Sequence, residues 1–157
     1  MAGVLFDTSV YINALRRRDT SVFSQTRVAA VESASEKGDL KRSENKPLYL
    51  SAVVLEELYV GALDRRMKKL LAKFENGFEQ ISRLLVPNRS DWTTGGQILS
   101  LIGQKHGFEA VGRARMTNDC LIAMTAARCG LTVITHNAGD FKLIAEFRPF
   151  QWTKIKL

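Results

Sequence analysis

Short apolar runs alternate with longer segments of mixed polarity along this chain. The runs that predict buried strands are 4–6, 48–51, 85–86, 131–135 and 151–156. The segments that predict helices are 9–17, 22–36, 53–63, 64–84, 90–107 and 118–130. Strands separated by helices in this order predict an α/β fold, in which a mostly parallel sheet is covered by helices on both faces. The length predicts a single domain, residues 1–157.

Acidic residues follow several of the predicted strands. Asp7 comes directly after the first strand, and Asp140 lies in the loop after a later one. Glu56 and Glu57 fall in the first turns of the helix after the second strand, and Asp119 begins the largely apolar helix NDCLIAMTAARC. Ligands of such folds bind beyond the carboxyl ends of the parallel strands. The sequence therefore predicts acidic residues from four segments at one edge of the sheet.

Each of these acids also has a purely structural explanation. Asp7 and Asp119 are suited to cap helices, and Asp140 to organise a turn. A glutamate on a helix is ordinarily a solvated surface residue. The joint occurrence favours a bound cation, because carboxylates held close together raise one another's pKa unless a cation neutralises them. Oxygen ligands suit Mg²⁺ or Mn²⁺, whereas His106 and His136 are too scattered to form a zinc site with the two cysteines.

Charge narrows the choice of partner. The net charge is +7 and the pI about 9.7, which favours a polyanionic partner. The excess forms four clusters: Arg16–Arg18; Lys41, Arg42 and Lys46; Arg65, Arg66, Lys68 and Lys69; Arg113 and Arg115. Solvated helix faces would explain any single cluster, but their number favours nucleic-acid phosphates. No apolar stretch approaches the roughly 20 residues of a membrane span and MAGVLFDTS lacks a leader pattern, so we expect a cytoplasmic protein without membrane contact.

Three ordered motifs contain the acids: VLFDTSVYI (4–12), SAVVLEELYVGA (51–62) and NDCLIAMTAARCGLTVITHNAGDF (118–141). Together they resemble the PIN-domain ribonucleases, and within them the VapC-type toxins of toxin–antitoxin pairs. The resemblance implies a PIN-like three-layer sandwich. It also implies catalytic and metal-binding roles for Asp7, Glu57, Asp119 and Asp140.

Helical spacing supports Glu57 over Glu56 independently, because Glu57 shares a helix face with Val53 and Val54. Several polar residues near the acids are candidates for supporting hydrogen bonds: Thr8, Ser9, Asn118, Thr135 and Asn137. The candidates for contacts with RNA phosphates are Arg16, Arg17, Arg113 and Arg115.

The function implied by the resemblance is a Mg²⁺- or Mn²⁺-dependent endoribonuclease. Water would attack the phosphorus in line, leaving a 5′-phosphate and a 3′-hydroxyl. A toxin of this kind would bind a cognate antitoxin at the acidic pocket and form a homodimer. Tyr59, Phe74, Phe78 and Trp92 could serve such surfaces, although we expect most of them to pack in the core.

Two other functions remain open at this point. One is a solitary RNA-processing PIN nuclease without an antitoxin. The other is a non-catalytic module that binds nucleic acid or a protein partner through an inactive acidic pocket. A haloacid-dehalogenase-type phosphatase is disfavoured, because it needs a second Asp two residues after Asp7, where this chain has Ser9.

Overall fold

The described part of the chain forms a central six-stranded sheet, with β1 (Val4–Phe6) in its middle. The computed structural model describes residues 2–29 and 45–155. The strand order is β2 (Arg27–Val28), β3 (Lys46–Ser51), β1, β5 (Thr132–Thr135) and β6 (Trp152–Lys154), and β4 (Leu84–Leu85) also pairs with β3. Among these described strands, only the β2–β3 pairing is antiparallel. The predicted mostly parallel sheet is therefore confirmed.

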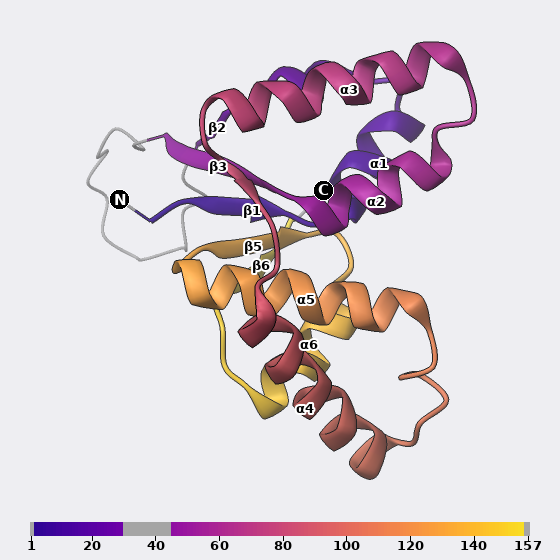
Figure 1. The fold of residues 1–157 in the computed structure, drawn as a ribbon, viewed down its shortest axis with the longest axis vertical. Coiled ribbons are helices and arrows are strands. Elements are labelled where there is room, and N and C mark those ends of the chain that lie inside the picture. Colours follow the sequence, from indigo (N-terminus) through magenta and orange to yellow (C-terminus); the bar gives the residue numbers. More distant parts are fainter. Residues whose placement is uncertain (1, 30–44, 156–157) are drawn as a thin grey trace.

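Helices cover both faces of this sheet, as the sequence predicts. The described residues form six α-helices: α1 (Thr8–Arg16), α2 (Ala52–Gly61), α3 (Arg65–Gln80), α4 (Arg89–His106), α5 (Ala114–Cys129) and α6 (Ala138–Phe147). In Figure 1, α1, α2 and α3 lie on one side of the sheet, and α4, α5 and α6 lie together on the other. In the part of the chain that the structure describes, no helix has both the length and the apolar character of a membrane span.

Aromatic side chains form the core beneath α1 and α3. Phe6, Tyr11, Phe23, Phe74 and Phe78 pack mostly edge to face, with ring centroids 5.0 to 5.7 Å apart. Phe74 and Phe78 both lie in the core at the inner face of α3, as expected for most of the four aromatic candidates, and are not available to a partner surface.

The other side of the sheet is covered mainly by α5. This helix is buried continuously from Asp119 to Ala126, as its nearly uniform apolar character predicts. It packs between α4, α6 and β5. Because Asp119 lies at the start of the buried stretch, its carboxyl group is held in the protein and not in bulk solvent.

The segment after α1 differs from its prediction. In place of a helix over 22–36, the described part contains a 3₁₀ turn at Ser21–Ser24 and the strand β2. β2 pairs with Lys46 and Pro47 of β3, which are distant in sequence. Such pairing depends on tertiary contacts that a local helical pattern does not reveal. Residues 30–44, including Lys41 and Arg42, lie outside the described part of the chain.

Two helix starts also differ, and both affect the acids. α5 begins at Ala114, so Asp119 lies in its second turn and does not begin the helix. α6 was predicted as a loop, but Asn137 caps it by accepting a hydrogen bond from the Gly139 amide at 3.4 Å. Asp140 therefore lies in the first turn of a helix.

Candidate active site

A pocket of about 380 Å³ opens where β1 and β5 end and α1 begins. Its walls come from α1, α2, α5 and the turn after β5. The lining residues are Asp7, Thr8, Ser9, Ile12, Asn13, Arg16, Glu57, Arg115, Asp119, His136 and Asn137. The pocket lies at the carboxyl edge of the parallel strands, where the sequence places the acids.

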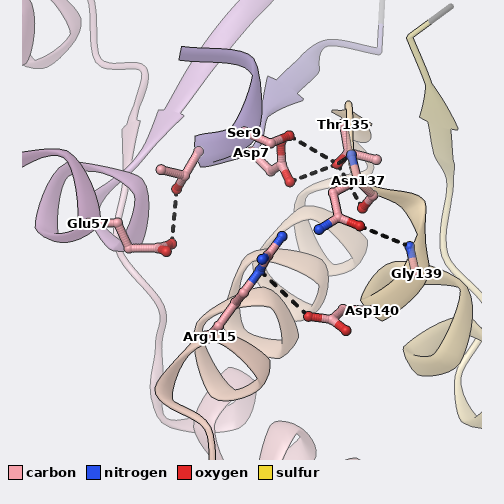
Figure 2. A network of polar contacts seen from close by, with 9 residues as sticks. Asp7, Ser9, Glu57, Arg115, Thr135, Asn137, Gly139 and Asp140 are labelled. Carbon is pink, nitrogen blue, oxygen red and sulfur yellow. Dashed lines mark hydrogen bonds and ion pairs between the residues drawn. The ribbon is translucent and has the colours of Figure 1, made fainter. Parts of the chain in front are cut away.

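Asp7 is fixed at the end of β1 by two hydroxyl groups. Its side chain is 4% exposed, and its oxygens accept hydrogen bonds from Ser9 Oγ at 2.5 Å and Thr135 Oγ1 at 2.8 Å (Figure 2). Burial raises the pKa of Asp7, and these hydrogen bonds oppose the rise. The amides of Ser9 and Val10 lie close enough to lower the pKa somewhat, although no capping hydrogen bond forms between this carboxylate and the described chain. Asp7 thus occupies the N-cap position of α1, but the hydrogen bonds from Ser9 and Thr135 are the ones that fix its carboxylate.

Glu57 and Glu56 point to different environments on α2. Glu57 is half-buried, lines the pocket and accepts a hydrogen bond from Thr8 Oγ1 at 2.9 Å. Burial raises the pKa of Glu57, against the Thr8 hydrogen bond, and the charges of Glu56 and Asp7 raise it further. Glu56 is exposed and accepts a hydrogen bond from Asn118 Nδ2 at 3.1 Å. The helix geometry thus brings Glu57 to the pocket, together with Asp7.

Asp119 has the most perturbed carboxyl group of the four. It is 7% exposed, and it cannot cap α5 because it lies in the second turn. Burial raises the pKa of Asp119 far above its usual range, and a hydrogen bond with Asp140 and the charges of Asp7, Asp140 and Glu57 raise it further. An acid in this position needs either a proton or a cation.

Asp140 lies beside this pocket, on α6. Its Oδ2 is 3.8 Å from Nε of Arg115, which reaches toward it from α5 (Figure 2). Its charge also raises the pKa of Asp119. The structure therefore brings Asp7, Glu57 and Asp119 to one pocket and places Asp140 at its side.

The chemistry of these donors fits a hard divalent ion, although their present positions do not enclose one. All four donors are carboxylates, which are ligands that Mg²⁺ and Mn²⁺ prefer. The charges of the other three raise the pKa of Asp119, and a bound cation would relieve this repulsion. Within residues 2–29 and 45–155, no three acidic, histidine or cysteine side chains converge closely enough to hold an ion as they stand. Glu57 is turned to Thr8 and Asp140 to Arg115. Binding an ion would require these side chains to leave those partners.

The candidates for supporting hydrogen bonds have different environments. Thr8, Ser9 and Thr135 contact the acids directly. The Asn137 side chain caps α6, and the Asn137 backbone N–H donates to Thr135 Oγ1 at 2.9 Å, so this residue supports the site through Thr135. Asn118 pairs with Glu56, outside the pocket lining.

The four candidate arginines separate into two groups. Arg16 and Arg115 line the pocket. Arg17 is the exposed C-cap of α1, and Arg113 is the exposed N-cap of α5.

Three further lining residues were not predicted as site residues: Ile12, Asn13 and His136. Ile12 and Asn13 lie four residues after Thr8 and Ser9 on the same helix, so helical spacing from those residues would have indicated both. His136 is half-buried in the pocket wall, and its amide donates to Ser9 Oγ at 2.9 Å.

Comparison with known proteins agrees with this fold. The structure of DNA-bound VapBC from Salmonella typhimurium is similar at 21% identity, with 98% of each chain covered and a TM-score of 0.58. VapBC-1 from nontypeable Haemophilus influenzae is similar at 22% identity, with 96% of each chain covered and a TM-score of 0.56. FitAcB from Neisseria gonorrhoeae is 26% identical, over 90% of this chain and 92% of that one, with a TM-score of 0.54.

No curated protein matches the chain significantly by sequence. The first two structural similarities concern the fold alone, because their identities are low. A sequence model of the PIN domain matches residues 4–146, which is most of the chain and includes all four acids. The family predicted from the ordered motifs is thus confirmed: this chain belongs to the PIN domain family.

Proposed function

We propose that this protein is a Mg²⁺- or Mn²⁺-dependent endoribonuclease. The main support is the pocket at the carboxyl edge of the sheet, where Asp7, Glu57 and Asp119 meet and Asp140 adjoins them. These four residues would hold the metal. When bound, the ion would neutralise the carboxylates and polarise the phosphodiester for attack by water.

The residues around the acids have complementary tasks in this proposal. Ser9 and Thr135 hold the Asp7 carboxylate in one orientation, because each donates to a different oxygen. Thr8 orients Glu57 in the same way. Rigid placement of such groups favours catalysis, since little reorganisation is then needed during the reaction.

The charges around the pocket support a nucleic-acid substrate. Arg16 and Arg115 lie in the pocket wall, where they are suited to bind the phosphates on either side of the cleaved bond. The chain as a whole carries a net charge of +7, which would attract RNA at long range.

We further propose that the protein is the toxin of a toxin–antitoxin pair and acts on RNA in the cytoplasm. The support is the similarity to chains solved as VapBC and FitAcB complexes. A cognate antitoxin and a second copy of this chain are the proposed protein partners. Tyr59 and Trp92 remain exposed and are available to such partners.

The decisive experiment compares two neighbouring glutamates. Single-stranded RNA is incubated with the wild-type protein, Glu57→Gln and Glu56→Gln, in Mg²⁺, in Mn²⁺ and in a chelator. We expect cleavage by the wild type and Glu56→Gln only with metal. Glu57→Gln should be slower by roughly 100- to 1,000-fold, the range for loss of a group that stabilises transition-state charge.

Three results would contradict the proposal. They are cleavage in the chelator, equal activity of Glu57→Gln and the wild type, and metal-independent RNA binding without cleavage. The last result would favour the non-catalytic binding module. The toxin assignment has its own test: the product of a short adjacent reading frame should co-purify with this protein and inhibit cleavage.

A further inference from the structure

Arg115 occupies a position that helix stability does not explain. It is the second residue of α5, whose first turn contains no acidic side chain. A positive charge at the amino end of a helix opposes the helix dipole, which favours anions there. The guanidinium instead reaches across to Asp140 on α6, at 3.8 Å (Figure 2). Its location is therefore accounted for by the acidic pocket and not by its own helix.

The contact between Arg115 and Asp140 is loose. The distance lies near the upper limit for an ion pair, and no hydrogen bond between these two side chains forms within the described chain. The two side chains are 56% and 31% exposed, respectively. Ion pairs of this kind contribute little to stability and exchange readily with other partners.

Arg115 nevertheless influences more than one acid. It lines the pocket together with Asp7, Glu57 and Asp119, and its charge lowers the pKa of Glu57 against the larger effect of burial. Among the described residues it is the cation that forms an ion pair with a member of the acidic set. It thus acts as a partial counterion for the set when no metal is bound.

A divalent ion at this site would compete with Arg115. Both cations attract the Asp140 carboxylate, whose Oδ2 lies 3.8 Å from Arg115 Nε and whose charge also acts on Asp119. After the exchange, Arg115 would be left beside the metal without its acidic partner. A guanidinium has a planar set of donors that matches two phosphate oxygens.

We propose that Arg115 is an exchangeable cation: it pairs with Asp140 in the metal-free pocket, yields Asp140 to Mg²⁺ or Mn²⁺, and then binds a phosphate of the RNA. This proposal rests on the proposed function and extends it by giving one residue two successive partners. Metal loading and substrate binding are then linked, because the metal releases the group that binds the substrate.

The first test needs the metal alone. Thermal unfolding is followed during titration with Mn²⁺ for the wild type, Arg115→Gln and the control Arg113→Gln, which removes the same charge from an exposed residue outside the pocket lining. Arg115→Gln should reduce the metal concentration at the midpoint by roughly three- to tenfold, as expected for removing a competing charge a few ångströms away. Arg113→Gln should change it by less than about twofold, because Arg113 is exposed outside the pocket lining, where solvent and salt screen its charge.

The second test uses RNA. Arg115→Gln should raise KM for RNA about tenfold at saturating metal, while Arg113→Gln raises it much less. Arg115→Lys keeps the charge but not the planar donor set, so it should restore the wild-type metal midpoint and only part of the KM.

The outcomes separate the two proposals. Suppose that Mn²⁺ stabilises the wild type but the midpoint Mn²⁺ concentration of Arg115→Gln is unchanged, or shifts no more than that of Arg113→Gln. The exchange proposal for Arg115 is then wrong, and the nuclease proposal stands. If Mn²⁺ and Mg²⁺ have no effect on the unfolding of the wild type, both proposals fail.

Discussion

Replacing Asp119 with Asn should stabilise the metal-free protein while abolishing cleavage. Asp119 is buried at the start of the apolar part of α5, and its pKa is raised by burial, by Asp140 and by the charges of Asp7 and Glu57. In the unfolded chain the same carboxyl group ionises near 3.8. The folded protein therefore has to bear either a proton or an uncompensated charge at neutral pH, and Asn removes both requirements.

The size of the effect follows from the linkage between protonation and folding. A carboxyl group that stays protonated in the fold at pH 7 but ionises at 3.8 when unfolded costs at most (7 − 3.8) × 1.36, or about 4 kcal/mol. The Asn amide still has to be accommodated in a polar pocket, which removes roughly 1–2 kcal/mol of the gain. The net expectation is a stabilisation of about 2–3 kcal/mol at pH 7, or an increase in Tm of roughly 4–12 °C for a chain of this size.

The pH dependence identifies the cause of the gain. A raised pKa means that the folded protein binds the Asp119 proton more tightly than the unfolded chain does. The contribution of Asp119 to the free energy of unfolding is therefore fully present at low pH and decreases as pH rises above 3.8. The same arithmetic limits the gain to about 1.6 kcal/mol at pH 5, against about 4 at pH 7. The advantage of Asp119→Asn should therefore grow between pH 5 and pH 7.

Urea unfolding of both proteins in a chelator, at pH 5 and at pH 7, measures this difference. The difference between variant and wild type removes the contributions of titrating groups that do not interact with Asp119. An Asp119→Asn protein that is less stable than the wild type at pH 7, or whose advantage does not change with pH, would refute the electrostatic reasoning. Saturating Mn²⁺ should reduce the advantage, because it stabilises the wild type more than the variant.

Three further substitutions test other parts of the structure. Asp91→Ala should destabilise the fold by about 2–4 kcal/mol in urea unfolding, because it removes part of the N-terminal cap of α4 and a buried carboxylate that accepts from Arg128 at 2.9 Å. Under conditions where this variant is folded, its cleavage rate should equal that of the wild type. Thr8→Val should lower kcat about three- to tenfold with little change in Tm, because Glu57 loses its hydrogen bond, and Thr8→Ser should retain activity. Phe74→Ala should cost about 3–5 kcal/mol in urea unfolding, and a smaller loss would contradict its place in the aromatic core.

Much of the site was predictable because its positions follow from local rules. Asp7 directly follows Val4–Phe6, a run that is short, apolar and fully buried, so its place at the edge of the sheet required only the recognition of one strand. The choice of Glu57 over Glu56 followed from helical spacing, and the structure places Glu57 in the pocket and Glu56 in solvent. Both inferences depend on contacts within a few residues.

Other features depend on contacts that the sequence does not display. The strand β2 exists because Arg27 and Val28 pair with Lys46 and Pro47, which local pattern cannot show. α6 was missed because AGDF opens with small and polar residues, and its support comes from Phe141 and Ile144 packing into the core. α5 begins at Ala114, earlier than predicted, and its first turn carries Arg115 at the pocket. None of the motifs indicated this early start of the helix.

Two buried acids show why the residue type alone does not distinguish a structural carboxylate from a candidate site carboxylate. Asp91 on α4 and Asp119 on α5 are 3% and 7% exposed, on helices that pack against each other. Burial acts to raise the pKa of Asp91, but hydrogen bonds from Arg128 and the Asn88 amide outweigh it, and the pKa is lowered. The pKa of Asp119 is raised, because its nearest partners are other acids.

The protein itself therefore satisfies Asp91, and the charge on that residue stabilises the fold above its normal pKa. Asp119 destabilises the fold over the same pH range, and none of the ion pairs among the described residues involves it. Strongly perturbed carboxyl groups of this kind cluster at functional sites, where a ligand or a cation offsets the cost. This contrast, between an acid matched by its own chain and an acid without a partner cation, is the physical reason to propose binding and catalysis at the pocket beside β1 and β5 and not at the acid on α4.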